Sequence, residues 1–452
     1  MTRSIKLAVA AAMALGTTSA FATNGDSLIG LGAKSRAMAG IGIGMSHGAE
    51  SGLSNPALIH SNEITFGGTI FMPDVKMKNE IQGMPNPTSY ADSDSDLSVI
   101  PEVALSVKVN DSFTWGVGMY GVAGMGVDYR DDVAVYGNPP SPSGPQNAYM
   151  GTMSGTNQML TNLQLMRFAV PLAYHVSGFS VAVSPILQYG SLSIAYNNGS
   201  YFMAPDGKGG AVPVNVLTSN GVSQDFGFGY NIGLSYEMAG LTIGAVYTSA
   251  IDMEYKNQIS SASKNFGMKQ GKGLSDHLEQ PAELGLGVSY KLGGSTFAID
   301  YKQIKWSSAK GYEDFEWEDQ NVIMLGYEYA TKGWAVRVGY NYASNPIKEQ
   351  SAASMMTPGE YDGAVINYFN AAGFPAITES HYAIGGSYII SETFGVDFAY
   401  TYSPEISESY DTSALTQAMA AGKGDPNARN YKSKAKVKHS QQGITVAMTI
   451  KF

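Results

Sequence analysis

The feature that most constrains this chain is a two-residue alternation of large apolar side chains with small or polar ones. In FGFGYNIGLSY, residues 226 to 236, the even positions hold Phe, Tyr, Ile or Leu and the odd positions hold Gly, Asn or Ser. Successive side chains of a strand point to opposite faces, so this segment predicts a strand with one apolar face. The pattern recurs in LGLGVSYKL, WAVRVGYNY, FGVDFAYTY and the final GITVAMTIKF. The chain therefore predicts many amphipathic strands.

These strands fit a membrane barrel better than a soluble β-sandwich, which would also alternate. Their apolar faces are nearly unbroken and end in Tyr or Trp, as in a lipid-facing band with aromatic girdles. The composition agrees, with 53 Gly, 28 Tyr and only 15% charged residues. The chain has no cysteine, so its stability cannot depend on disulfides, and its net charge of −10 argues against nucleic acid as a partner.

Short and long connections alternate along the chain, which predicts an all-β, 14-stranded antiparallel transmembrane β-barrel with periplasmic turns and external loops. The short turns fall at 110–111, 177–178, 238–240, 293–294, 331–333 and 391–392, and the long connections at 79–98, 131–157, 198–222, 257–278, 308–320, 344–376 and 404–434. An even strand number places both termini on the periplasmic side. The last strand, ending at Phe452, should pair with the first, near residues 64–78, because an open sheet edge is not tolerated in a membrane.

The amino-terminal part of the chain divides into two segments ahead of the barrel. Residues 1–22 combine Arg3 and Lys6, an apolar run and a small-residue end, which indicates a secretory signal peptide. Residues 23–61 lack the alternation but contain apolar residues such as Leu28, Ile29 and Met38. They predict a compact plug inside the barrel, with a flexible periplasmic tail as the alternative. The barrel itself is assigned to residues 62–452.

Several motifs resemble one family. NGDSLIGLGAKSRAMAGIGIG, followed by SGLSNPALI, resembles the amino-terminal hatch of the FadL family of outer-membrane transporters, which includes a TodX-like branch. The resemblance extends to NDSFTWGVGMYG, QPAELGLGVSYKL, IKWSSAK and AVRVGYNYASNPI. It implies a hatch inside a 14-stranded barrel, a hatch motif at Asn55, Pro56 and Ala57, and passive uptake of long-chain fatty acids or of aromatic or aliphatic hydrocarbons. It also implies a kinked third strand that opens the barrel wall for lateral release.

The sequence has a physical counterpart to that kink. The alternation breaks in GVAGMGVDY, where Gly121, Gly124 and Gly126 cluster. Glycines inside a strand mark bulges and bends, although small residues can also line a pore. We predict the lateral opening here.

Ligand contacts are expected in the external loops and in the lumen. Apolar residues in exposed loops predict a hydrophobic capture groove, with packing of one loop on another as the alternative. The groove candidates are Tyr201, Phe202, Met203, Val214, Leu217, Phe266 and Met268. Fatty-acid members of the family resembled carry an arginine in strand five, where this chain has QYGSLSIAY with Ser191 at that place. A neutral ligand is therefore favoured, unless Arg167, Lys291 or Arg337 holds a carboxylate.

Other classes of function find no support in the sequence. The six histidines show no metal-ligand spacing, the LGLG repeat lies within a predicted strand, and we find no GxSxG nucleophile elbow between a strand and a helix, so we expect no enzyme, metal or cofactor. The expected partners are a hydrophobic small molecule, outer-membrane lipid and lipopolysaccharide, and the barrel assembly machinery, with the protein a monomer. A general diffusion porin is the main alternative, and a structural or adhesive barrel comes after it.

Overall fold

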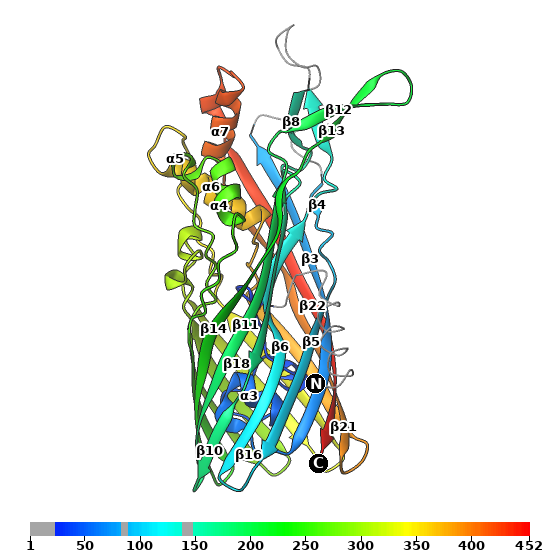
Figure 1. Ribbon diagram of the computed structural model, residues 1–452, viewed down its shortest axis with the longest axis vertical. Helices are drawn as coiled ribbons and strands as arrows, with labels where there is room; N and C mark the ends of the chain where they lie inside the picture. The colour runs from blue at the N-terminus through cyan, green and yellow to red at the C-terminus, as the bar shows by residue number, and fades with distance from the viewer. Residues whose placement is uncertain (1–22, 83–88, 138–147) are drawn as a thin grey trace.

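The computed structural model describes residues 23–82, 89–137 and 148–452. The expected signal peptide, residues 1–22, lies outside the described residues. Within them the chain forms a closed, 14-stranded antiparallel barrel, as the alternation predicted. Figure 1 shows a tall barrel with short turns at one end and long loops at the other. We call these the short-turn end and the long-loop end.

Each wall strand pairs with its neighbours in the chain, and β9 and β10 are two halves of one strand that is interrupted at Val170 and Pro171. The wall strands are β3 (Glu63–Ile81), β5 (Ser98–Lys108), β6 (Phe113–Asp128), β9 (Leu160–Ala169), β10 (Leu172–Val176), β11 (Phe179–Tyr196), β14 (Thr218–Met238), β15 (Leu241–Thr248), β16 (Glu283–Leu292), β17 (Ser295–Ile304), β18 (Gln320–Ala330), β19 (Trp334–Ala343), β20 (Ser380–Ile389), β21 (Phe394–Asp411) and β22 (Ser433–Lys451).

The barrel closes between its last and first strands. β22 pairs with β3 along its whole length, from Lys451 opposite Glu63 to Ser433 opposite Ile81. The predicted closing pair is therefore confirmed. Phe452, just past this ladder, donates its backbone N–H to the carbonyl of Asn62 at 3.1 Å.

The two faces of the wall follow the alternation of the sequence. In β14, Phe226 and Phe228 are 57% and 79% exposed on the outer face, whereas Asn231 and Ser235 are buried on the inner face. Inward positions elsewhere carry buried polar groups such as Asp300. The outer face is thus an apolar band, and the inner face is a polar surface that needs partners.

Residues 23–61 fold inside the barrel near its short-turn end, in blue in Figure 1. They form short elements: β1 (Thr23–Asn24), β2 (Ser27–Leu28), α2 (Ala33–Ala37), η1 (Gly48–Glu50), α3 (Ser51–Ser54) and η2 (Pro56–Leu58). Almost all of these residues are buried. We call residues 23–61 the hatch, although their boundary as a domain stays a prediction.

The loops at the long-loop end carry the remaining elements. These are β4 (Ala91–Asp92), the hairpins β7 (Ala134–Gly137) with β8 (Ala148–Thr152) and β12 (Tyr201–Pro205) with β13 (Ala211–Asn215), α4 (Ile259–Asn265), α5 (Met268–Gly271), η3 (Trp306–Ser308), η4 (Glu313–Phe315), α6 (Glu360–Ala372), α7 (Ser413–Gly422) and η5 (Ala428–Asn430). In α6 every residue from Gly363 to Ala372 is buried. Across the part of the chain that the structure describes, no helix has both the length and the apolar character needed to cross a membrane.

Candidate functional site

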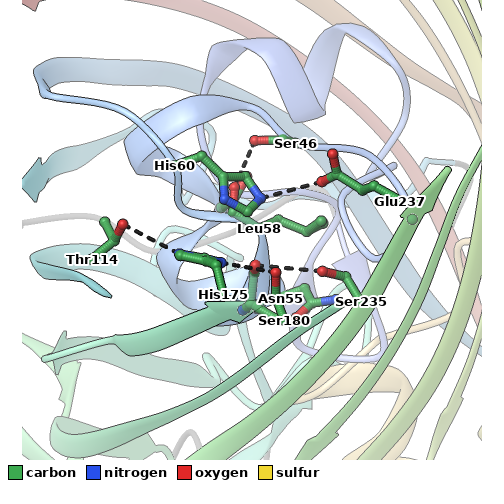
Figure 2. A network of polar contacts seen from close by, with 12 residues as sticks. Ser46, Asn55, Leu58, His60, Thr114, His175, Ser180, Ser235 and Glu237 are labelled. Carbon is green, nitrogen blue, oxygen red and sulfur yellow. Dashed lines mark hydrogen bonds and ion pairs between the residues drawn. The ribbon is translucent and has the colours of Figure 1, made fainter. Parts of the chain in front are cut away.

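The predicted hatch motif joins the hatch to the barrel wall (Figure 2). The side-chain oxygen of Asn55 accepts the N–H of Ala57 at 3.1 Å and so caps η2, whose first residue is Pro56. The Asn55 amide donates to the carbonyls of Ile43, at 2.9 Å, and of Leu234 in β14, at 3.2 Å. The motif therefore holds one turn of the hatch against the wall.

A second attachment uses one carboxylate of the wall. Asp300 in β17 accepts the backbone N–H groups of Gly42, Ile43 and Gly44 at 2.8, 2.7 and 3.1 Å. A Cβ on Gly44 would lie 2.4 Å from the backbone of Gly287, so only glycine lets the hatch approach this closely. The GIGIG run thus provides three convergent donors for a buried anion.

Buried charges fix the rest of the hatch. Arg36 contacts Glu102 of β5 at 3.3 Å, and Lys34 contacts Asp397 of β21 at 3.8 Å. Glu50 is buried beside these groups, and neither of its side-chain oxygens has a hydrogen-bond partner among the described residues. Burial raises the pKa of Glu50 to about 8.

The hatch leaves the lumen past a pair of histidines, which Figure 2 shows at close range. The ring of His60, which follows the hatch turn, lies 4.4 Å from the ring of His175 in β10. His60 contacts Glu237 of β14 at 3.2 Å. Within the described residues, no group of three His, Asp or Glu side chains is placed to hold a metal ion.

The wall has an incomplete seam where the kink is predicted. β5 pairs with β6 from Lys108 opposite Thr114 as far as Glu102 opposite Tyr120. The other edge of β5 pairs with β3 from Ser98 to Ser106, and in the described structure residues 121–128 of β6 have no partner in β5. The register of β6 against β9 also shifts between Gly121 and Ala123. Gly121, Gly124 and Gly126 all lie in this stretch, but their part in release stays a prediction.

The hatch covers the seam from inside. β2 pairs with the free edge of β6 through Ser27 opposite Ala123, and Gly124 donates its N–H to the carbonyl of Asp26 at 3.1 Å. Leu28 and Ile29 then form a small apolar cluster with Phe71 of β3 and Ile100 of β5. A side chain on Gly121 would meet Ile100 at 2.6 Å. The hatch strand therefore covers the middle of the seam, and at its far end Asp128 is hydrogen-bonded to Ser93 and Asp94.

Next to the seam, toward the long-loop end, lies a small aromatic cavity. It is lined by Met125, Leu278, Tyr312, Phe315, Trp317, Asn370 and Phe374. Its volume is about 10 Å³, so a ligand can enter only by displacing a side chain. Asn370 accepts the indole N–H of Trp317 at 3.0 Å and donates to the carbonyl of Phe315 at 3.2 Å. The polar atoms of Asn370 are thus engaged, and the cavity offers mainly hydrophobic contact.

A buried carboxylate of the hatch stands between the cavity and the seam. Asp26 is 0% exposed and accepts hydrogen bonds from the hydroxyl of Tyr312, from the Gln280 amide at 2.9 Å and from the Ser27 hydroxyl at 3.4 Å. No Lys or Arg among the described residues forms an ion pair with it. Burial raises the pKa of Asp26.

The predicted lumen cations differ in their surroundings. Arg167 lines a second cavity of about 80 Å³ between hatch and wall, with Glu283 and Lys302, and donates to Gln188 at 2.9 Å. Arg337 is engaged by Glu328, at 2.7 Å, near the short-turn end. Lys291 is exposed beside the 293–294 turn.

Ser191 stands at the position where the sequence comparison placed the arginine of fatty-acid transporters. Ser191 lies on the outer side of β11, whereas its neighbours Gly190 and Leu192 face the lumen and are buried. Because Ser191 does not face the lumen, its identity does not show whether the lumen lacks an arginine. The lumen-facing residues of β11 at this level, Gly190 and Leu192, are uncharged, and Asp225 of β14 lies opposite Gly190.

The groove candidates fall into two groups. Phe202 and Met203, 54% and 44% exposed, lie on the protruding β12–β13 hairpin with Tyr201 and Val214, and Leu217 lies between this hairpin and β14. Phe266 instead packs on Phe369 of α6 at 5.1 Å, and Met268 is buried. Figure 1 shows the hairpin and α4–α5 on opposite sides of the long-loop end. The structure does not bring the two groups together, and a groove formed by either one stays a prediction.

Sequence reasoning missed the residues around the aromatic cavity. The sequence predicts the connection 308–320 as one of the long external loops, yet its Tyr312, Phe315 and Trp317 are buried, as is Trp306 just before it. Four aromatic residues within 12 positions were a usable signal. Asp26 and Gln280, in contrast, carry no such signal.

Sequence comparison places the chain among outer-membrane proteins. The family model described as "Outer membrane protein transport protein (OMPP1/FadL/TodX)" matches residues 7–452. A long-chain fatty acid transport protein of Escherichia coli K12 is 24% identical over 400 residues, covering 76% of this chain and 84% of that protein. A 47 kDa outer membrane protein of Pasteurella multocida is 29% identical over 173 residues, covering 32% of this chain and 40% of that protein.

Solved structures show the same architecture. The crystal structure of a Pseudomonas aeruginosa FadL homologue matches with a TM-score of 0.65 and 14% identity, over 95% of this chain and 100% of that one. The Pseudomonas putida toluene transporter TodX matches with a TM-score of 0.59 and 17% identity, over 94% of this chain and 99% of that one. At these identities the likeness shows the fold alone.

Proposed function

Since this chain belongs to the OMPP1/FadL/TodX family of outer membrane transport proteins, we propose that it is a passive channel for hydrophobic small molecules. The observation that carries this proposal is the aromatic cavity, formed by apolar side chains beside a seam that the hatch covers from inside. Ligand would enter at the long-loop end, occupy the cavity and leave sideways through the seam into the membrane. Desolvation supplies the driving force, about 0.8 kcal/mol for each buried methylene.

The ligand we propose is neutral. Aromatic side chains dominate the cavity, and the polar groups of Asn370 and Tyr312 are already hydrogen-bonded. A carboxylate there would lose its water without gaining a cation, which is costly. An aromatic or aliphatic hydrocarbon meets no such cost. A fatty acid would have to place its carboxylate at Arg167 and Lys302 in the polar cavity.

The orientation follows from the same reasoning. The short turns and both termini would face the periplasm, and the long loops would face the outside. The outer apolar band would contact outer-membrane lipid and lipopolysaccharide, and the terminal strand would be read by the barrel assembly machinery. A monomer satisfies this arrangement because the barrel closes on itself.

Competition uptake in a deletion strain tests the proposal. Cells that express the protein are given labelled toluene, and unlabelled toluene, decane or oleate is added as competitor. We expect strong competition by toluene and decane and weak competition by oleate. Glucose and small antibiotics are the polar controls, because a general diffusion porin would carry them. Import of the polar solutes without import of toluene would replace the channel by a porin. Competition by oleate that exceeds competition by unlabelled toluene and decane would replace the hydrocarbon by a fatty acid.

A further inference from the structure

The turn formed by Gly25, Asp26 and Ser27 connects two parts of the molecule that otherwise have separate tasks. On one side, Ser27 and the carbonyl of Asp26 bind the free edge of β6. On the other side, the turn lies against aromatic residues from the connection between β17 and β18. The same three residues therefore contact both the seam and the wall of the aromatic cavity.

Gly25 makes the contact with the aromatic side close. Its φ is +67°, and a Cβ there would lie 2.5 Å from the indole ring of Trp306. Only glycine combines this backbone conformation with so close an approach. The Trp306 ring lies 4.6 Å from that of Tyr312, which lies 4.8 Å from that of Trp317. The turn thus rests on a continuous stack of rings.

Tyr312 is the member of that stack that lines the cavity and also binds the hatch, through its hydroxyl and the carboxylate of Asp26. Because the cavity measures only about 10 Å³, a ligand the size of toluene must push a lining side chain aside. Movement of Tyr312 would remove one of the three donors of a fully buried carboxylate. A buried carboxylate that loses donors gains by moving toward water.

We propose that Asp26 is a positioning residue whose hydrogen bond to Tyr312 holds β2 on the edge of β6, so that ligand entering the aromatic cavity frees the seam. This inference rests on the proposed function and adds the residue pair that couples ligand to exit. The Gln280 amide donates to both Asp26 and Ser27, at 2.9 and 3.1 Å, and is a second attachment of the same turn.

The chain has no cysteine, so a single introduced thiol can report on β2. Ala123 is 1% exposed and lies opposite Ser27, so the thiol of Ala123→Cys should react with a small maleimide only when β2 has left. Adding Tyr312→Phe keeps the ring and removes the hydroxyl. We expect the labelling rate to rise about tenfold, the equivalent of one hydrogen bond to a charged group. The matched control is Tyr255→Phe, because the buried hydroxyl of Tyr255 has no hydrogen-bond partner in the described structure.

Toluene supplies the second arm of the experiment. In the Ala123→Cys protein it should raise the labelling rate toward that of the Tyr312→Phe variant, and in that variant it should add little. Equal rates with and without the Tyr312 hydroxyl, or an equal rise in the Tyr255→Phe control, would overturn the proposal. A rise with Tyr312→Phe but none with toluene would overturn the ligand trigger.

Two further measurements separate the possible failures. Heat-modifiable migration establishes that each variant is folded, and Asp26→Ala replaces Tyr312→Phe if that variant fails, with the same expected rise. Ser27→Cys with Ala123→Cys, oxidised, should block toluene uptake until it is reduced. Failure of the proposed function looks different, because the unmodified protein would then import none of toluene, decane or oleate, whatever the labelling rates.

Discussion

Replacing Asp300 by alanine should loosen the hatch, because this carboxylate holds three of its backbone donors. The N–H groups of Gly42, Ile43 and Gly44 all lie within 3.1 Å of its oxygens. A hydrogen bond to a charged group contributes about 1.5–3 kcal/mol, and the three share one acceptor group, so their contributions do not simply add. Water that replaces the carboxylate recovers part of the loss. We expect the attachment to weaken by about 2–4 kcal/mol, which raises the detached population roughly 30- to 1,000-fold.

Two assays measure this loosening. Hydrogen exchange of residues 42–44 should accelerate by about that factor, since exchange reports local opening. Conductance of the protein in planar bilayers should rise, because a detached hatch leaves the lumen open to ions. Glu328→Ala is the matched control, since Glu328 is a lumen carboxylate whose partner, Arg337, belongs to the wall. If exchange and conductance in the Asp300 variant match those of the control, the three hydrogen bonds do not hold the hatch.

Four further predictions concern other parts of the molecule. Between pH 4.5, the ordinary pKa of Glu50, and its folded value of about 8, the folded state binds the extra proton, so the free energy of unfolding falls as pH rises. Glu50→Gln should reduce the dependence of the free energy of unfolding on pH, measured by melting curves between pH 5 and 8. An unchanged dependence would mean that another group causes it. Gly121→Val and Gly124→Val should each cut toluene uptake while loop binding persists, since a side chain at Gly121 meets Ile100; normal import by both would exclude lateral release. Asn55→Ala with Pro56→Ala removes the η2 cap and the contact to Leu234, and should lower uptake at equal surface expression. Deleting Phe452 should reduce heat-modifiable protein in the outer membrane, and normal assembly would contradict this role of the terminal aromatic.

The barrel could be predicted from sequence because the alternation of side chains that defines it is present within each strand. A strand that faces lipid on one side must alternate, and the alternation of residues 226–236 reappears as alternating exposure in β14. Pairing of the last strand with the first followed from the requirement that no edge be left open, and β22 does pair with β3. Neither inference required knowledge of distant contacts.

The candidate site could be predicted only in part because its contacts are distant in sequence. Asp26 and Tyr312 are 286 positions apart, and neither is unusual in its own segment. Phe202 and Phe266 have the same loop-borne apolar character, yet one is exposed on a hairpin and the other is packed on α6. Composition indicates that apolar loop residues need a partner, but it does not say which one. The need of Asp300 for partners is easier to predict from sequence, because a charge at an inward position of a membrane strand requires hydrogen-bond donors nearby.

The distribution of polarity inside the barrel gives a physical reason for a lateral route. Toward the short-turn end the lumen is filled by a hatch held through buried charges, Lys34 with Asp397 and Arg36 with Glu102. An apolar ligand that passed straight through would have to separate such pairs, and breaking a buried pair costs about 3–5 kcal/mol. It would then enter water and lose the burial that drew it in, about 6 kcal/mol for a ligand of eight methylenes. At the seam it meets Leu28, Ile29 and a single strand pairing, with apolar surroundings on the far side. The proposed sideways path would avoid both costs, so under this proposal the charges that fix the hatch would also direct a hydrophobic ligand toward the wall.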